Sequence, residues 1–294
     1  MVSGSPDRIG LLGTGRMGTA LGSRLLDSGF TLEVWNRTES KTRELVDRGA
    51  LVAPTISKLG QCPVVLISVS ASDDLIAVLD RDTGLLASAA SGSVIIDCST
   101  VSPEASAAAR RRCADADVAF LAAPVSGNPS VVRSARAAIA VSGPDDAFAR
   151  VRHVLAALSS RVFHVGSQEQ SRLVKLCQNL YLGMTIEALV EVLALAGAAG
   201  ISTESFLSYL NSTVVGSEWL VNRTASIVAR DWTPTFTLEL LNKDFDLGLA
   251  EARQLQVTMS SADLVRGHIQ AALAAGMKDL DMLGALFERQ MRTK

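Results

Sequence analysis

The sequence has few of the residues that most often build metal centres, disulfide frameworks and hydrolytic triads. Its 294 residues include four cysteines and three histidines. Neither a CxxC pair nor a metal-type spacing occurs among the cysteines, so we expect reduced thiols and no metal site. The isolated histidines form no recognisable Ser–His or Cys–His triad, which disfavours a hydrolase. The cysteines are Cys62, Cys98, Cys113 and Cys177.

An excess of one charge and long apolar runs are also missing. Lys and Arg total 28 and Asp and Glu total 30, so no broad basic surface is expected for nucleic acid or anionic lipid. No window reaches the roughly 18 uninterrupted apolar residues that span a bilayer, and residues 1–7 contain no apolar signal core. We therefore expect a cytoplasmic protein without a nucleic-acid or membrane partner.

What the sequence does contain is enough apolar material for two sizeable cores, since 48% of its residues are hydrophobic. From residue 8 to about residue 166, short apolar runs alternate with longer amphipathic stretches. This alternation is typical of a parallel sheet covered by helices on both faces. The expected strands are 9–12, 32–35, 64–69, 94–97 and 118–121, and the expected helices are 17–28, 39–48, 73–79 and 103–114.

The pattern changes after residue 166. Residues 168–199 lack proline and carry apolar residues at helical spacing, which predicts one long helix that Gly200 ends. No strand-like alternation follows. The sequence therefore predicts a doubly wound α/β domain over residues 1–166 and an all-helical domain over residues 167–294. The further expected helices are 203–210, 218–229, 238–255 and 262–275.

A glycine-rich turn follows the first expected strand and has the form G-x-G-x-x-G. Gly13 allows a tight turn, Gly15 lets the backbone approach a pyrophosphate, and Gly18 lets the next helix pack closely on the sheet. Free N–H groups at the start of that helix would bind the anion. The pattern predicts a dinucleotide site at Gly13, Thr14, Gly15, Arg16, Met17 and Gly18.

The end of the second expected strand indicates which dinucleotide is favoured. Asn36 stands where NAD-binding domains of this kind carry a carboxylate for the ribose hydroxyls. Arg37 brings a guanidinium suited to a 2′-phosphate, and Thr38 and Lys41 can add donors. Glu33 lies in mid-strand and would not reach the ribose. We therefore expect NADPH to be preferred over NADH.

The long helix carries a lysine and an amide at helical spacing. None of the residues three or four positions from Lys175 is acidic. Asn179 lies one turn further on and projects from the same face. The two side chains could therefore point into one cleft, where the ammonium would give a proton and the amide would orient an oxygen. A lysine on a helix is, however, more often a solvated surface charge.

These motifs together resemble the β-hydroxyacid dehydrogenase family, which includes 3-hydroxyisobutyrate dehydrogenase and tartronate semialdehyde reductase, over nearly the whole chain. Residues 36–38 resemble the NRT signature of the NADP-preferring members, and residues 97–100 resemble the family's D-x-S-T stretch. Residues 122–128 are similar to its DAPVSGG segment, and residues 175–179 to its K-x-x-N-N motif. The Lys-Asp pair at 243–244 matches a late pair near the cofactor.

The resemblance implies a Rossmann domain that binds NADP(H), a small-molecule substrate, and an active site between the two domains. It implies that Lys175 gives a proton to the carbonyl oxygen, that Asn179 positions the substrate, and that the helical domain joins the chain into a homodimer or homotetramer. The substrate-binding residues that it implies are Ser126, Gly127 and Asn128. The remaining cofactor contacts that it implies are Val69, Ser70, Thr100 and Lys243.

The sequence also departs from the family pattern. An asparagine at position 128 replaces a glycine, and its side chain would intrude on a carboxylate pocket, so a substrate larger or less anionic than 3-hydroxyisobutyrate stays open. The other departures are Ala122, Glu169, Ser171 and Gln178.

The leading hypothesis is an NADP-dependent dehydrogenase or reductase acting on a 3-hydroxy acid or a semialdehyde-type compound. An imine reductase is an alternative, because such enzymes share this architecture and the NRT type of loop, but they usually carry Asp or Tyr where Lys175 stands. A non-catalytic NADPH-binding module is a third hypothesis. The presence of both Lys175 and Asn179 disfavours it, because a pure binder needs neither.

Overall fold

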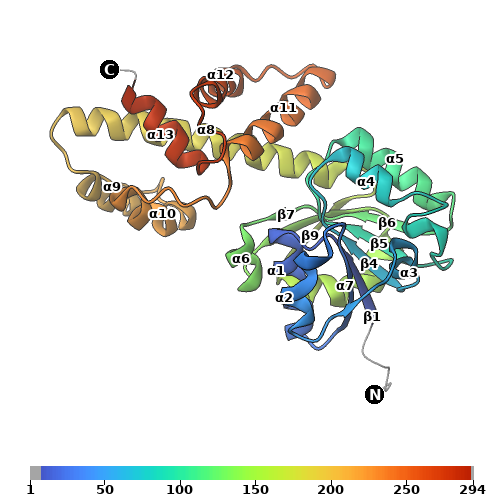
Figure 1. Ribbon diagram of the computed structural model, residues 1–294. Helices are drawn as coiled ribbons and strands as arrows, with labels where there is room; N and C mark the ends of the chain where they lie inside the picture. Colours follow the sequence, from blue (N-terminus) through green and yellow to red (C-terminus); the bar gives the residue numbers. More distant parts are fainter. Residues whose placement is uncertain (1–7, 293–294) are drawn as a thin grey trace. The chain divides into compact units, whose positions relative to one another are not determined.

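The computed structural model describes residues 8–292 (Figure 1). The chain divides into two compact units, one ending at Lys175 and the other beginning at Leu176. The division falls inside a long helix, α8 (Gln170–Ala198). The domain boundary expected after residue 166 stays a prediction.

The first unit is built on one sheet. Its strands are β1 (Arg8–Leu12), β2 (Thr31–Trp35), β3 (Leu51–Val52), β4 (Val64–Ile67), β5 (Val94–Asp97), β6 (Ala119–Ala122), β7 (Val125–Ser126), β8 (Ala138–Ser142) and β9 (Arg161–Gly166). The strand order is β3-β2-β1-β4-β5-β6-β8-β7, with β9 beside β8. From β3 to β6 every pairing is parallel. This is the order of a doubly wound dinucleotide-binding domain, so the expected α/β fold is confirmed.

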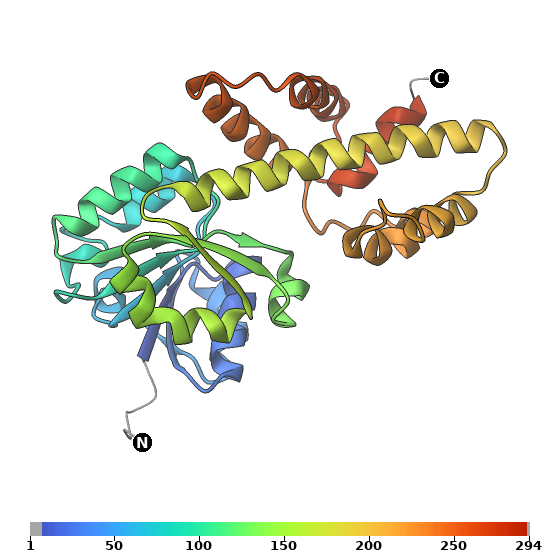
Figure 2. The same ribbon diagram turned by 180° about the vertical axis from the view of Figure 1, so that it is seen from behind.

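The central strands are apolar because both faces of the sheet are covered, as Figures 1 and 2 show. In β4, Leu66 packs into one hydrophobic core, whereas Val65 and Ile67 pack into the core on the opposite face. Because successive side chains of a strand alternate between faces, such strands need apolar residues at every position. The helices of this unit are α1 (Arg16–Asp27), α2 (Arg43–Val46), α3 (Ile56–Gly60), α4 (Ser72–Val78), α5 (Pro103–Ala114), α6 (Pro129–Arg133) and α7 (Asp145–Leu158), with the 3₁₀ helices η1 (Glu39–Thr42) and η2 (Leu85–Ala87).

The later part of the sheet was not predicted from the sequence. β8 runs antiparallel to β6 and β7, and β9 runs parallel to β8. β8 does carry a short apolar run, with Ile139 and Val141 buried, and this signal was overlooked. β9 has no fully buried residue and includes Arg161 and His164, so it gives a weaker signal. The helix expected over 39–48 is also shorter in the structure, where η1 and α2 share that stretch.

The second unit is helical, as expected. Besides most of α8, it contains α9 (Thr203–Asn211), α10 (Glu218–Ala229), α11 (Leu238–Gln254), α12 (Ser260–Ala274) and α13 (Met282–Arg292). Two glycines let α8 and α11 approach closely. A Cβ at Gly183 would lie 2.4 Å from the Phe245 ring, and a Cβ at Gly248 would lie 2.8 Å from Leu180.

The length and composition of α8 would allow it to cross a membrane, with a mean hydropathy of 1.6 over its most apolar window. However, one face of the helix is buried in the core of the helical unit through Leu180, Ile186, Leu189, Val190 and Leu193. Burial of this face accounts for part of the apolar composition of α8, since 44% of that window is buried.

Candidate active site

The glycine-rich loop between β1 and α1 contains two kinds of glycine. Gly13 has φ +90°, and a Cβ there would lie 2.1 Å from the Ser68 carbonyl oxygen. A Cβ at Gly18 would lie 1.8 Å from the Gly13 carbonyl oxygen. At Gly15, by contrast, a Cβ would meet nothing within 4 Å. The fold itself therefore requires Gly13 and Gly18, whereas Gly15 borders open space where a ligand would approach.

This loop lines a pocket whose backbone N–H groups and cationic side chains suit the phosphates of a dinucleotide. Gly15 is the N-cap of α1 and supplies no side chain to bind the first N–H groups of the helix. The Thr14 hydroxyl is buried without a hydrogen-bond partner among the described residues. The pocket has a volume of about 580 Å³ and includes three cationic side chains. Its lining residues are Thr14, Gly15, Arg16, Thr19, Ser40, Lys41, Glu44, Pro129 and Arg133.

The residues after β2 divide into a structural asparagine and an exposed arginine. Asn36 Oδ1 accepts a hydrogen bond from the Thr14 amide at 3.0 Å, and Asn36 Nδ2 donates to the Thr38 carbonyl at 2.9 Å. Asn36 thus joins the loop after β2 to the glycine-rich loop. The Arg37 side chain is 87% exposed and lies 3.7 Å from Asp74, so it can turn toward a ligand at low cost.

The loops that follow β4 and β5 are tied together by the Asp-Cys-Ser-Thr stretch. Ser99 Oγ donates to Asp97 Oδ1 at 2.6 Å and accepts a hydrogen bond from the Val69 amide at 2.9 Å. Val69 and Ser70 after β4 therefore belong to the same end of the sheet as Thr100 after β5. Burial raises the pKa of the Cys98 thiol to about 12, so this cysteine is neutral and not a nucleophile.

The segment after β6 brings a hydroxyl to the candidate lysine. Ser126 ends β7, and its Oγ lies 3.5 Å from Lys175 Nζ. Gly127 follows with φ +143°, a conformation that favours glycine. Ser126, Gly127 and Lys175 are thus close together within the first unit, although they lie about 50 positions apart in the sequence.

The structure gives Asn128 a role that the sequence analysis did not foresee. Asn128 is the N-cap of α6, and its Oδ1 accepts a hydrogen bond from the Val131 amide at 3.0 Å. This capping contact accounts for an asparagine at position 128 without any substrate. A contact between Asn128 and substrate stays a prediction.

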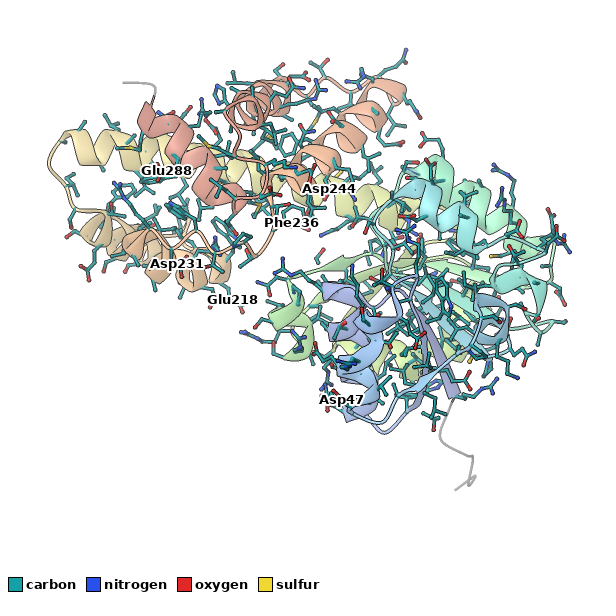
Figure 3. All side chains as sticks on the ribbon, in the orientation of Figure 1. Asp47, Glu218, Asp231, Phe236, Asp244 and Glu288 are labelled. Carbon is teal, nitrogen blue, oxygen red and sulfur yellow. The ribbon has the colours of Figure 1, made fainter. Side chains whose placement is uncertain are left out.

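The second unit holds a polar group of its own on α8 and α11. Asn179 is 3% exposed, and its amide donates to Asp244 Oδ2. Lys243 Nζ lies 3.6 Å from Asp244 Oδ1, and Asp244, labelled in Figure 3, is buried. Asp244 therefore binds the amide of Asn179 and lies near the ammonium of Lys243. Asn179 and Lys243, both predicted site residues, thus share one buried carboxylate.

Two of the departures from the family pattern make contacts that a glycine could not. Glu169 forms an ion pair with Arg110 at 2.9 Å. The Ser171 hydroxyl donates to the Ala122 carbonyl at 2.9 Å and shares a hydrogen bond with Ser142. The Ser171 contacts hold the start of α8 against β6 and β8, and the Glu169 ion pair ties the residue before the helix to α5. The sequence analysis also missed Arg172, a buried residue on the same turn.

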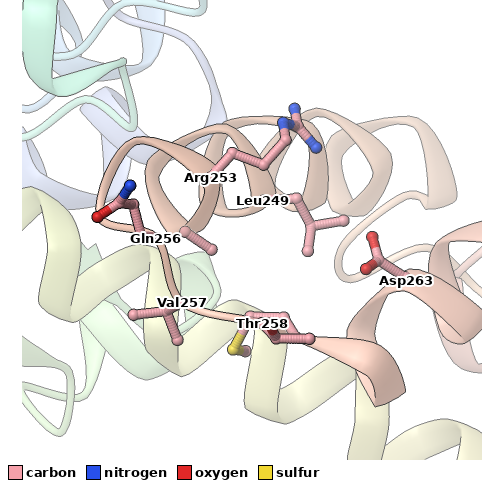
Figure 4. A pocket seen from close by; sticks show the side chains of 8 residues that line it. Leu249, Arg253, Gln256, Val257, Thr258 and Asp263 are labelled. Carbon is pink, nitrogen blue, oxygen red and sulfur yellow. The ribbon is translucent and has the colours of Figure 1, made fainter.

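A second pocket, of about 360 Å³, lies in the helical unit between the end of α11 and the start of α12 (Figure 4). None of the predicted site residues lines it. The residues that do are Leu249, Ala252, Arg253, Gln256, Val257, Thr258, Met259 and Asp263.

Family models match both halves of the chain. Residues 8–166 match the NAD-binding domain of 6-phosphogluconate dehydrogenase. Residues 170–286 match the model described as NAD-binding of NADP-dependent 3-hydroxyisobutyrate dehydrogenase. Together the two matches account for both the α/β and the helical part.

Full-length relatives agree with these matches. The chain is 30% identical to an uncharacterized oxidoreductase of Bacillus subtilis, with 93% of this chain and 96% of that protein covered. It is also 30% identical to the 3-hydroxyisobutyrate dehydrogenase of Pseudomonas aeruginosa, with coverages of 90% and 92%.

Solved structures share the fold. A 3-hydroxyisobutyrate dehydrogenase from Salmonella typhimurium is similar at a TM-score of 0.85 and 24% identity, covering 95% of this chain and 98% of the other. An imine reductase from Pseudomonas sp. is similar at a TM-score of 0.65 and 22% identity, covering 97% and 99%. With both family models and the relatives in agreement, the chain belongs to the β-hydroxyacid dehydrogenase family of pyridine-nucleotide-dependent oxidoreductases.

Proposed function

We propose that this protein is an NADP(H)-dependent dehydrogenase or reductase that interconverts a carbonyl and a hydroxyl group in a 3-hydroxy acid or semialdehyde-type compound. The observation that carries the proposal is the 3.5 Å distance between Lys175 Nζ and Ser126 Oγ. It brings a potential proton donor to the segment that resembles the substrate-binding motif of the family.

The cofactor would bind at the glycine-rich loop. The N–H groups at the start of α1 and the cationic side chains of Arg16 and Lys41 suit a pyrophosphate, and the exposed guanidinium of Arg37 suits a 2′-phosphate. When bound, the nicotinamide supplies the hydride chemistry. The relatives do not decide between the two cofactors, since one that is 25% identical is named an NAD-dependent L-serine dehydrogenase.

In the direction of reduction, Lys175 would give its proton to the carbonyl oxygen as the carbonyl carbon receives a hydride. The Ser126 hydroxyl, next to the ammonium, would bind the substrate carboxylate, and Gly127 would allow its backbone to approach. Asn179, held by Asp244, would orient the substrate oxygen rather than ionise. In the reverse direction Lys175 would accept the proton from the hydroxyl group.

Imine reduction is the second candidate, because structures of imine reductases share this fold. A relative that is 30% identical over 90% of this chain is a 3-hydroxyisobutyrate dehydrogenase, and this favours the carbonyl reaction. A protonated imine also needs no proton from the enzyme when it accepts a hydride. Imine reduction would therefore not require Lys175 as a proton donor.

The test is a panel of semialdehydes, ketones, 3-hydroxy acids and cyclic imines assayed with both cofactors, followed by the absorbance of the reduced nicotinamide. We expect turnover of a semialdehyde or hydroxy acid with the NADP couple. Turnover of imines alone, or equal use of NADH, would contradict the proposal.

We also propose that the protein is cytoplasmic and assembles through its helical unit. Several large apolar side chains of this unit are exposed, among them Leu195, Tyr209 and Val215. Exposed apolar side chains supply area that a contact between copies of the chain would bury. Light scattering after gel filtration should give a dimer or tetramer, and a monomer would contradict the proposed assembly.

A further inference from the structure

Arg172 is the largest charged side chain buried in the first unit, with 1% of its surface exposed. It lies in the first turn of α8, three residues before Lys175. Each of its guanidinium nitrogens has a partner on another element. Nη2 donates to Asp97 Oδ2 at 2.5 Å, Nη1 to the Ser99 carbonyl at 2.6 Å, and Nε to Ser106 Oγ at 3.1 Å.

Stability alone is a weak reason for such an arrangement. Removing two charges from water is costly, and a buried ion pair can often be replaced by apolar residues without loss of stability. Burial combined with several hydrogen bonds instead fixes geometry, because a planar guanidinium accepts only a narrow range of positions for its partners. Arg172 therefore fixes the relative positions of the segments that it contacts.

Two of its three contacts are made with the end of β5 and the loop that follows it, at Asp97 and Ser99. Asp97, the partner of the guanidinium, also accepts hydrogen bonds from the Ser99 amide and hydroxyl. The same Ser99 hydroxyl accepts the hydrogen bond of the Val69 amide after β4. A continuous chain of contacts thus runs from the first turn of α8 through Asp97 and Ser99 to the loop after β4.

We propose that Arg172 is a positioning residue that sets the distance between the Lys175 ammonium and the loops after β4 and β5. The inference rests on the proposed function, in which Lys175 moves the proton. It assigns the nicotinamide half of the cofactor to those loops, where the family resemblance implies contacts from Val69, Ser70 and Thr100. A helix turn pinned at Arg172 carries Lys175 with it. Because hydride and proton must reach adjacent atoms of one carbonyl group, an error of about 1 Å in this distance can lower turnover about 100-fold.

The first variant for the test is Arg172→Lys, which keeps a positive charge for Asp97 but loses the planar guanidinium group and its set of hydrogen-bond donors. The second is the double variant Asp97→Asn with Arg172→Gln, which removes both charges together. A third variant, Ser99→Ala, removes the hydroxyl that binds the Val69 amide and leaves Arg172 in place. It keeps the inference testable if the other variants do not fold.

The matched control is Arg110→Gln. Arg110 also fastens the start of α8, through Glu169 and the Gln168 carbonyl, and it donates to the Phe120 carbonyl of β6. These partners lie outside residues 97–99. A role in stability alone would make the two arginines equivalent.

Each variant is measured in three ways. Thermal unfolding gives the melting temperature, steady-state kinetics give kcat and KM with the best carbonyl substrate, and titrations give the Kd values of NADPH and of 2′,5′-ADP, which contains only the adenosine half. We expect Arg172→Lys and Ser99→Ala to lower kcat about 10- to 100-fold and to leave the Kd of 2′,5′-ADP within about 2-fold of wild type. The NADPH Kd should rise relative to that of 2′,5′-ADP. Arg110→Gln should lower the melting temperature with kcat within about 3-fold of wild type.

Equal kcat losses in the Arg172 and Arg110 variants, or a kcat that follows the melting temperature across the set, would overturn the inference. If the wild type reduces no carbonyl compound, the proposed function is wrong. The positioning role of Arg172 can then still be tested through the ratio of the NADPH Kd to the 2′,5′-ADP Kd. A ratio that is unchanged in both Arg172→Lys and Ser99→Ala would contradict the positioning role independently of any activity.

Discussion

The glycine-rich loop and the first turn of α8 both hold backbone of the candidate active site in place, and they do so by opposite means. The loop works by lacking side chains: Gly13 and Gly18 permit backbone contacts that any Cβ would break. The turn of α8 works by adding them, since Ser171 binds the Ala122 carbonyl and Arg172 binds the Ser99 carbonyl. The first solution depends on local conformation, and the second depends on partners 49 and 73 positions away.

The largest effect should come from Gly18→Ala, because its Cβ would lie 1.8 Å from the Gly13 carbonyl oxygen. We expect a loss of about 3 kcal/mol in the free energy of unfolding, or no soluble protein. Gly15→Ala is the matched substitution, since its Cβ meets nothing within 4 Å. Urea unfolding and NADPH titration of both should show a stable Gly15→Ala protein that binds NADPH at least about 10-fold more weakly. Equal destabilisation by the two substitutions would remove the distinction between the glycines.

Lys175→Ala should have the next largest effect, on turnover rather than on folding. General acid–base catalysis typically contributes about 10²- to 10⁴-fold, so kcat should fall within that range while the NADPH Kd stays near the wild-type value. Lys278→Ala, at an exposed lysine of the helical unit, serves as the control. Near-normal turnover of a carbonyl substrate by Lys175→Ala would remove the lysine from the mechanism and favour imine reduction or a binding module.

Arg37→Ala should weaken NADPH binding selectively. A charge-assisted hydrogen bond is worth about 1.5–3 kcal/mol, which corresponds to an increase of about 10- to 100-fold in the NADPH Kd. NADH, which has no 2′-phosphate, should be unaffected. Arg48→Ala provides the control, because Arg48 also forms a surface ion pair in the first unit, with Asp27. An equal loss for both cofactors would show that Arg37 does not read the 2′-phosphate.

The smallest effect should come from Asn128. Loss of a helix N-cap to alanine costs about 1 kcal/mol and to glycine only a few tenths, so Asn128→Ala should be the less stable of the two variants in urea. We expect both to keep the substrate preference of the wild type, because the side chain already binds the Val131 amide. If Asn128→Gly turned over small 3-hydroxy acids faster, the side chain would also narrow the pocket, as the sequence alone suggests.

Much of the architecture could be predicted from the sequence, because it rests on local patterns. The buried strands are continuous apolar runs, and the glycine-rich loop has a fixed spacing set by the geometry of its turn. The strand β9 gives a weaker signal, because none of its residues is fully buried. The predicted roles of the site residues stay predictions.

Other contacts could not be predicted because they join residues far apart in the chain. The spacing around Lys175 shows Arg172 only as a neighbouring charge, whereas the structure pairs it with Asp97 in the interior. In the same way, position 128 alone does not reveal that Asn128 caps α6, since α6 itself was not expected.

The central claim is that this site reduces a carbonyl group with NADPH while Lys175 supplies the proton. The most direct test is to incubate the protein with NADPH deuterated at nicotinamide C4 and a semialdehyde, and to follow deuterium in the product by mass spectrometry for the wild type and Lys175→Ala. The account predicts deuterium on the new carbinol carbon, formed rapidly by the wild type and at least about 100-fold more slowly by the variant. Product formation at the same rate by both proteins, or no deuterium transfer by the wild type to any carbonyl compound, would contradict it.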